Sequence, residues 1–203
     1  RERTHALETA LRQVRELGPL PYLAEHLSGQ TAYRLQFGVA HGWPELTLSS
    51  DLTGLASALP EPLGKPAARA WPLRVALALE ADSLAPGRSP RDTLRVQLGQ
   101  ELWLHYRRAL GESGATRVLA GAIGVGETLP LPSAGVRARV VLPQVDLDRW
   151  RAVASSFEAG LGAGEAVSGG YAPDRVELRS PQVQLAGRSF QGVRVQGERA
   201  GDG

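Results

Sequence analysis

The chain has 203 residues, enough for one large domain with a sizeable core. It contains no Cys, which excludes disulfides and Cys-based metal sites. With 23 basic and 21 acidic residues, the formal net charge is only +2, and the basic residues are scattered along the chain. This balance gives no support for nucleic-acid binding. We also expect no membrane span within these residues, because no apolar run approaches the ~20 residues that a spanning helix needs.

The N-terminal segment has the spacing of an amphipathic helix. Between residues 4 and 17, apolar side chains recur every three or four positions with Arg and Glu between them. Gly18 and Pro19 then end the pattern. We therefore expect residues 1–30 to form a helical lead-in segment.

From residue 31 the apolar period changes to two. Alternating segments follow one another through residue 142, and the pattern resumes after residue 175. Successive side chains of a strand point to opposite faces, so each such segment has one apolar and one polar face. This is typical of antiparallel sheets that are wet on one side. We expect an antiparallel sheet over residues 31–145 and strands continuing it over residues 170–198, with a tail at 199–203.

Turns and one further helix interrupt the strands. The pair Gly99-Gln100 predicts a tight hairpin in which Gly supplies a positive φ. Asp146 can cap a helix over residues 146–159, whose apolar stripe contains Leu147, Trp150 and Phe157. Glycines follow, so we expect residues 146–165 to be this helix and a glycine-rich loop. The predicted fold class is mainly β, a curved sheet with two helices.

Residues that could carry chemistry are not gathered in the sequence. The four His residues have no metal-ligand spacing, and there is no G-x-S-x-G nucleophile motif. Asp146 and Asp148 lie close together, but capping at a helix start explains them more simply than an acid pair. The glycine-rich "AGAIGVGET" lacks a phosphate-binding Lys and favours a strand with close packing. We expect no enzyme activity, cofactor or metal.

The apolar face of the predicted sheet has two interpretations. In a closed sandwich it is simply core, which is the simpler reading of the alternation alone. In an open, bent sheet it forms a groove that can shield acyl chains. The candidate groove-lining residues, taken from the inward positions, are Leu35, Phe37, Leu48, Val75, Leu77, Val96 and Leu104.

Three stretches resemble the central region of YhdP-type, AsmA-like envelope proteins. The first contains "SSDLTGLASALPEPLGKPA" and "PLRV" within residues 17–75, matching a family pattern in which "SDLxGLxxxLPxPLGKPA" precedes "PLRV". The second is "LPQVDLDRWRAV" (142–153), and the third is "APDRVELRSPQVQLAGRSFQGVRVQGE" (172–198). The stretches follow the family's order and together cover most of the chain. The segment "PYLAEHLSG" is longer than the family's usual "YLSG" form.

The resemblance implies a periplasmic piece of a protein anchored in the inner membrane of a Gram-negative bacterium. It also implies a curved β-groove that conducts phospholipid between the two membranes and supports the outer-membrane permeability barrier. The expected partners are phospholipid acyl chains and neighbouring β modules of the full-length protein. The family offers no catalytic residues to carry over. A structural or protein-interaction module of the envelope, without lipid binding, is the alternative.

Overall fold

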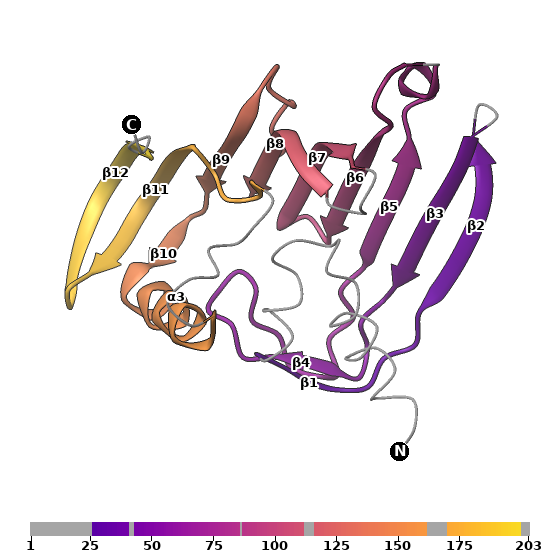
Figure 1. Cartoon of the computed structure of the whole chain (residues 1–203). Coiled ribbons are helices and arrows are strands. Elements are labelled where there is room, and N and C mark those ends of the chain that lie inside the picture. Colours follow the sequence, from indigo (N-terminus) through magenta and orange to yellow (C-terminus); the bar gives the residue numbers. More distant parts are fainter. Residues whose placement is uncertain (1–25, 41–42, 86, 112–115, 162–169, 200–203) are drawn as a thin grey trace.

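We describe a computed structural model of the chain over residues 26–40, 43–85, 87–111, 116–161 and 170–199. The helix predicted over residues 4–17 and the glycine-rich loop after residue 161 lie outside these ranges. The core of the structure is one long, bent sheet, with a small two-stranded sheet and a helix at one end of its strands (Figure 1).

Ten strands form the main sheet. Its spatial order is β2, β3, β5, β6, β7, β8, β9, β11. The strands β9 and β10 pair with the same edge of β11, one after the other along it, and β12 pairs with the other edge. The strand bounds are β2 Arg34–Ala40, β3 Trp43–Ser50, β5 Leu73–Leu79, β6 Arg91–Leu98, β7 Leu102–Leu110, β8 Thr116–Val125, β9 Gly135–Val141, β10 Gln144–Asp146, β11 Arg175–Leu185 and β12 Arg188–Glu198.

The smaller elements connect these strands. β1 (Leu27–Gly29) and β4 (Leu55–Ser57) pair antiparallel as the two-stranded sheet, and η3 (Ala81–Leu84) is a 3-10 turn between β5 and β6. α3 (Leu147–Leu161) follows β10 and contacts β11. β1 lies within the range expected to be a helical lead-in. Leu27 belongs instead to an extended segment whose side chain packs against the Leu52, Leu55 and Trp71 cluster.

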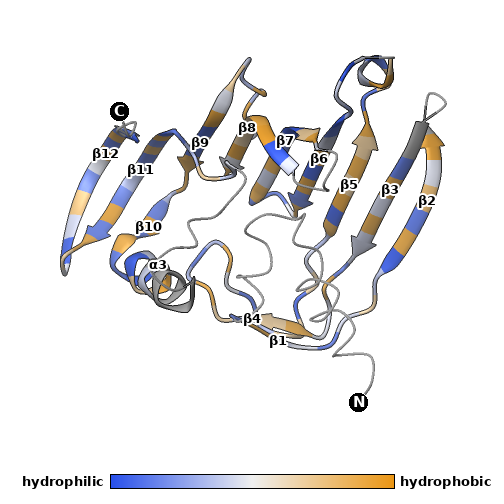
Figure 2. Cartoon of the chain, viewed as in Figure 1, coloured by the Kyte–Doolittle hydropathy of each residue, from blue (hydrophilic) through white to orange (hydrophobic). Residues whose placement is uncertain are grey.

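The two-residue period produces the predicted two-faced sheet, and the mainly β fold class is confirmed. Colouring by hydropathy shows bands of opposite character alternating along the strands (Figure 2). Buried Leu94, Val96 and Tyr106 lie on one face, which we call the apolar face. Arginines such as Arg95 and Arg137 lie on the other, the polar face. Whether the apolar face is a closed core or an open groove therefore depends on which segments cover it.

The sheet is mixed rather than purely antiparallel. β8 pairs parallel with β9, and β11 pairs parallel with both β9 and β10. A parallel pair needs a crossover, because the chain must return to the starting end of the sheet. Residues 126–134 provide it, passing so close over the polar face of β8 that a Cβ on Gly124 would lie 2.2 Å from the Glu127 carbonyl oxygen.

Turn and cap chemistry follows the predictions. Residues 99–101 join β6 to β7, with Gly99 at a φ of +54°. The Asp146 carboxylate accepts a hydrogen bond from the Arg149 N–H (3.0 Å), which caps α3. The Asp148 carboxylate instead accepts from the N–H groups of Ala186 and Gly187, in the β11–β12 turn. The hydrogen bonds from Gly187 and Ala186 hold the pKa of Asp148 below its ordinary value. Both carboxylates are thus structural.

The strand interpretation of "AGAIGVGET" is confirmed, and it yields a first prediction. Gly121 lies in β8, where a Cβ would meet the Tyr106 ring at 2.6 Å and the Val136 side chain at 3.1 Å. Gly121→Ala is expected to lower the free energy of unfolding by about 1–3 kcal/mol, because overpacking forces Tyr106 from its position. Urea denaturation of the variant measures this, and unchanged stability would show that the ring has room to move.

Candidate functional site

The seven residues predicted to line a groove all lie on the apolar face. Strand register places Leu35 opposite Leu48, Leu48 opposite Val75, Val75 opposite Val96 and Val96 opposite Leu104. These five therefore form one row across five neighbouring strands. Facing side chains in adjacent strands have Cβ atoms about 4.5–5.5 Å apart, so the row is a continuous apolar stripe.

A second row runs beside the first. Phe37 is opposite Leu46, Leu46 is opposite Leu77, and Leu77 is opposite Leu94. Phe37 and Leu77, the two remaining predicted residues, belong to this row. The register thus unites side chains that are up to 69 positions apart, from Leu35 to Leu104. That they contact lipid remains a prediction.

The apolar face is open at one edge and covered in the middle. On β2, Phe37 is 81% exposed and Val39 is 74% exposed. On β6, Val96 is only 3% exposed and packs in a core with Leu94 and Tyr106. The face is therefore exposed near β2 and forms a core near β6 and β7. That its exposed part is a lipid groove remains a prediction.

Tyr171, in the segment that leads into β11, covers part of the middle. Its ring packs edge-on against Tyr106, with 5.1 Å between ring centroids and 70° between planes. The Tyr106 hydroxyl donates a hydrogen bond to the Tyr171 carbonyl oxygen (3.2 Å). Burial raises the pKa of Tyr106 well above its ordinary range, so this hydroxyl stays protonated at neutral pH. Tyr171 thereby closes the apolar face at this point.

A buried ion pair on the apolar face holds the same segment. Arg108 and Asp92 face each other on β7 and β6 and are joined by two hydrogen bonds of 2.8 and 2.6 Å. Arg108 also donates to the Tyr171 hydroxyl at 3.0 Å. Burial alone would lower the pKa of Arg108, but the hydrogen bonds to Asp92 and Tyr171 outweigh it and keep this pKa raised. Arg108 therefore stays charged, and the pair is structural.

An apolar cavity of about 180 Å³ lies at the other end of the covered region. The β1–β4 sheet and the loop that follows β4 form one wall, with Leu55, Leu59 and Leu63. The main sheet forms the opposite wall, and there the cavity is lined by Leu48, Val75 and Val96 of the first row. The exposed stripe on β2 thus leads into this apolar cavity.

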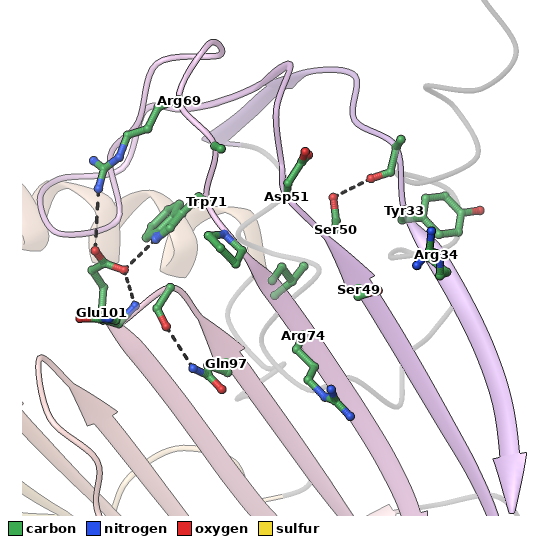
Figure 3. A pocket seen from close by; sticks show the side chains of 16 residues that line it. Tyr33, Arg34, Ser49, Ser50, Asp51, Arg69, Trp71, Arg74, Gln97 and Glu101 are labelled. Carbon is green, nitrogen blue, oxygen red and sulfur yellow. Dashed lines mark hydrogen bonds and ion pairs between the residues drawn. The ribbon is translucent and has the colours of Figure 1, made fainter.

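A wider, polar depression of about 1040 Å³ lies beside this cavity (Figure 3). Its Glu101 carboxylate accepts from the Trp71 indole N–H (2.8 Å) and the Gln100 N–H (2.8 Å), and Arg69 lies 3.7 Å away. Its Asp51 carboxylate accepts from the Thr53 N–H (3.0 Å). Both acids are thus held by neighbouring groups.

Ion pairs hold the polar face together. Glu80 contacts Arg91 (3.1 Å) and Arg107 (2.9 Å), and Glu177 contacts Arg139 (2.8 Å) and Arg179. The hydrogen bonds from Arg179 and Arg139 hold the pKa of Glu177 below its ordinary value. This charged face suits exposure to water.

Among the described residues, no three His, Asp or Glu side chains are placed to hold a metal ion. Burial, and then Arg95 and Arg107, lower the pKa of His105 below its ordinary value, against the opposing charge of Glu80. No helix in the described part of the chain combines the length and apolar character needed to cross a membrane.

Sequence reasoning missed two features of the site. Asp92 and Arg108 lie on the apolar face, and Tyr171 covers it, although none of the three was singled out. A signal existed for the pair, since a hairpin at Gly99-Gln100 places positions 92 and 108 opposite each other. Tyr171 carries no comparable signal, because its position depends on a crossover.

Comparison with known proteins identifies the family. The family model described as YhdP protein matches residues 6–203, nearly the whole chain. No curated protein and no solved structure matches the chain. The match covers the curved sheet, its apolar face and the loop between β4 and β5. The chain belongs to the YhdP family.

Proposed function

We propose that this chain is a non-catalytic periplasmic module that shields phospholipid acyl chains on their way between the inner and outer membranes. YhdP proteins are AsmA-like proteins of the bacterial envelope. The observation that carries the proposal is the apolar row from Leu35 to Leu104, which is open at β2 and lines an apolar cavity. A core that served only stability would not leave Phe37 81% exposed at its edge.

The uncovered part of the row suits a segment of an acyl chain. From Leu35 on β2 to Val75 on β5 it crosses two strand-to-strand steps of about 4.8 Å, a span of about 10 Å. One leaflet of a bilayer's hydrocarbon core is about 15 Å thick. Each CH₂ group that the row removes from water contributes about 0.8 kcal/mol, so a continuous stripe lowers the barrier to crossing an aqueous space.

The open edges support passage between modules. β2 pairs only with β3 and β12 only with β11 among the described residues, so each sheet edge has unpaired backbone groups. Neighbouring β modules of the full-length protein can add strands there, which would extend the apolar face. On β12, Val195 is 52% exposed on this face. In the full-length protein, we expect an anchor in the inner membrane to hold this array.

Photocrosslinking at adjacent residues of β2 tests the proposal. A benzophenone amino acid replaces Phe37, on the apolar face, or Gln36, which is also exposed but points to the polar face. The protein is crosslinked in cells and examined by mass spectrometry. We expect phospholipid adducts at position 37 and few at position 36. Equal labelling at the two positions, or none at 37 together with lipid-free protein in native mass spectrometry, would refute the conduit.

The alternative is a structural or interaction module. The exposed edges β2 and β12 also suit docking of another protein by strand addition. In that case position 37 would crosslink to protein rather than lipid. Specific capture of a partner would also be lost on substituting polar-face residues such as Trp103, which is half-buried opposite Gly124.

A further inference from the structure

Lys65, the chain's only lysine, occupies an unusual position between two hollows. It is 5% exposed and lines the apolar cavity described above. It also lines a shallow depression of about 370 Å³ on the outer side of the same loop. An ammonium group at the wall of an apolar space is costly unless it has partners, so its contacts need an explanation.

Backbone carbonyls account for part of that explanation. The Lys65 Nζ donates hydrogen bonds to the carbonyl oxygens of Leu52 (2.8 Å) and Leu55. An ammonium group has three N–H donors, so one is left without a partner among the described residues. Both acceptors are uncharged, and neither supplies a negative charge to balance the ammonium.

Other cations line the same outer depression. Arg69 and Arg149 join Lys65 there, against the single carboxylate of Glu61. Arg149 makes no ion pair with the described residues, and Arg69 reaches Glu101 only at 3.7 Å. Burial lowers the pKa of Lys65 and the charge of Arg69 lowers it further, while the charge of Asp51 opposes both without reversing the shift. The depression therefore carries an excess of positive charge that a bound anion would offset.

We infer that Lys65, Arg69 and Arg149 bind the phosphate of a phospholipid headgroup while the adjoining apolar cavity takes part of one of its acyl chains. The inference rests on the proposed function and adds a headgroup subsite to it. The two hollows share the lining residues Ser57, Leu59 and Lys65, so they adjoin each other. An apolar cavity of about 150 Å³ holds a benzene molecule, so about 180 Å³ holds a short stretch of acyl chain.

The residues around Lys65 fix its place in the loop after β4. A Cβ on Gly64 would lie 2.6 Å from the Leu59 carbonyl oxygen, so the loop closes this tightly only with glycine. The backbone of Lys65 pairs with Ser57 through hydrogen bonds of 2.8 and 3.1 Å. Trp150 of α3 donates to the Glu61 carbonyl oxygen at 3.1 Å, which brings the helix that carries Arg149 against the loop. The "PLGKPA" motif thus places the lysine between acyl and headgroup regions.

The single lysine provides a direct test. Lysine labelled with ¹³C at Cε gives one side-chain NMR signal from the 203-residue chain. Dioctanoyl-phosphatidylglycerol and dioctanoylglycerol share their acyl chains and differ in the phosphate headgroup. We expect the phospholipid to shift the Lys65 signal, raise the pKa of Lys65 and bind at least tenfold more tightly than the diglyceride. Inorganic phosphate at the same concentration is expected to leave the signal unchanged.

A matched pair of arginines on α3 separates the subsite from general surface charge. Arg149→Gln removes a lining residue of the depression, whereas Arg151→Gln removes an exposed arginine of the same helix that does not line it. We expect the first variant to lose about tenfold in phospholipid affinity and the second to lose little. Neither change touches the hydrogen bonds of Lys65 to Leu52 and Leu55, so folding is preserved.

Each other outcome overturns the inference in a distinct way. Equal binding of both lipids would leave the conduit standing without a headgroup subsite. Binding of neither lipid would refute the conduit for this chain as well. A shift with inorganic phosphate equal to that with phospholipid would indicate a site for free anions. Equal losses in the two arginine variants would show that only overall charge matters.

Discussion

Replacing Arg108 by methionine is expected to lower the free energy of unfolding by about 3–5 kcal/mol, among the largest effects of any single change in this chain. Asp92 is 3% exposed, so removal of its partner leaves an unpaired carboxylate in the core. The same change removes the hydrogen bond from Arg108 to the Tyr171 hydroxyl. Chemical denaturation monitored by circular dichroism measures the loss.

The double variant Arg108→Met, Asp92→Leu is the control for this prediction. Replacing both members of a buried ion pair with apolar side chains is often neutral or stabilising. We expect the double variant to recover most of the stability that the single variant loses. A single variant with wild-type stability would show that water or another residue reaches Asp92. A double variant as unstable as the single one would show that the Tyr171 contact matters more than the unpaired charge.

Local periodicity predicted the sheet because apolar and polar residues alternate within each strand, which identifies its two faces. The alternation Leu73, Val75 and Leu77 is visible without knowing what pairs with β5, and the structure places all three on the apolar face. Similarly, Asp146 lies immediately before an apolar helical stripe, and its carboxylate caps α3 as expected. These features depend on neighbours in sequence, which is why they were predictable.

Features that depend on distant segments were not predictable from periodicity. The parallel pairing of β8 with β9 depends on the path of residues 126–134, which have no strand pattern and can connect either kind of pair. The cover that Tyr171 provides depends on where the chain runs before β11. Leu52 continues the alternation of β3, yet it adopts a φ of +51° in a turn and packs under the β1–β4 sheet.

In the candidate site, too, local alternation predicted which face a residue is on, whereas its exposure depends on distant segments. Alternation placed the seven groove residues on one face, but it gave no measure of exposure along that face. Val96 and Phe37 have the same inward orientation, yet one is 3% and the other 81% exposed. The difference comes from the segments that fold over β6 and leave β2 open. The exposed and the buried parts thus belong to one apolar surface, and tertiary contacts set the boundary between them.

Leu77→Arg is expected to reduce phospholipid transfer by ten- to a hundredfold. Leu77 is half-buried in the second apolar row, between Leu46 and Leu94. An arginine within a hydrocarbon layer costs about 2.5–3.5 kcal/mol, and each 1.4 kcal/mol is a factor of ten in affinity. The side chain can partly reach water, which reduces the effect. Fluorescent phospholipid transfer between donor and acceptor vesicles measures it.

Ala78→Arg is the matched control, because it places the same charge one position along β5 on the polar face. There the new arginine lies opposite Glu45 and Thr93, where a cation is favourable. We expect transfer close to that of the wild type. Phe37→Arg provides a second test at a position so exposed that folding is unaffected, and it should impair transfer as well. If both apolar-face variants transfer lipid normally while remaining folded, the continuous row is not the lipid path, and the open edge serves another partner.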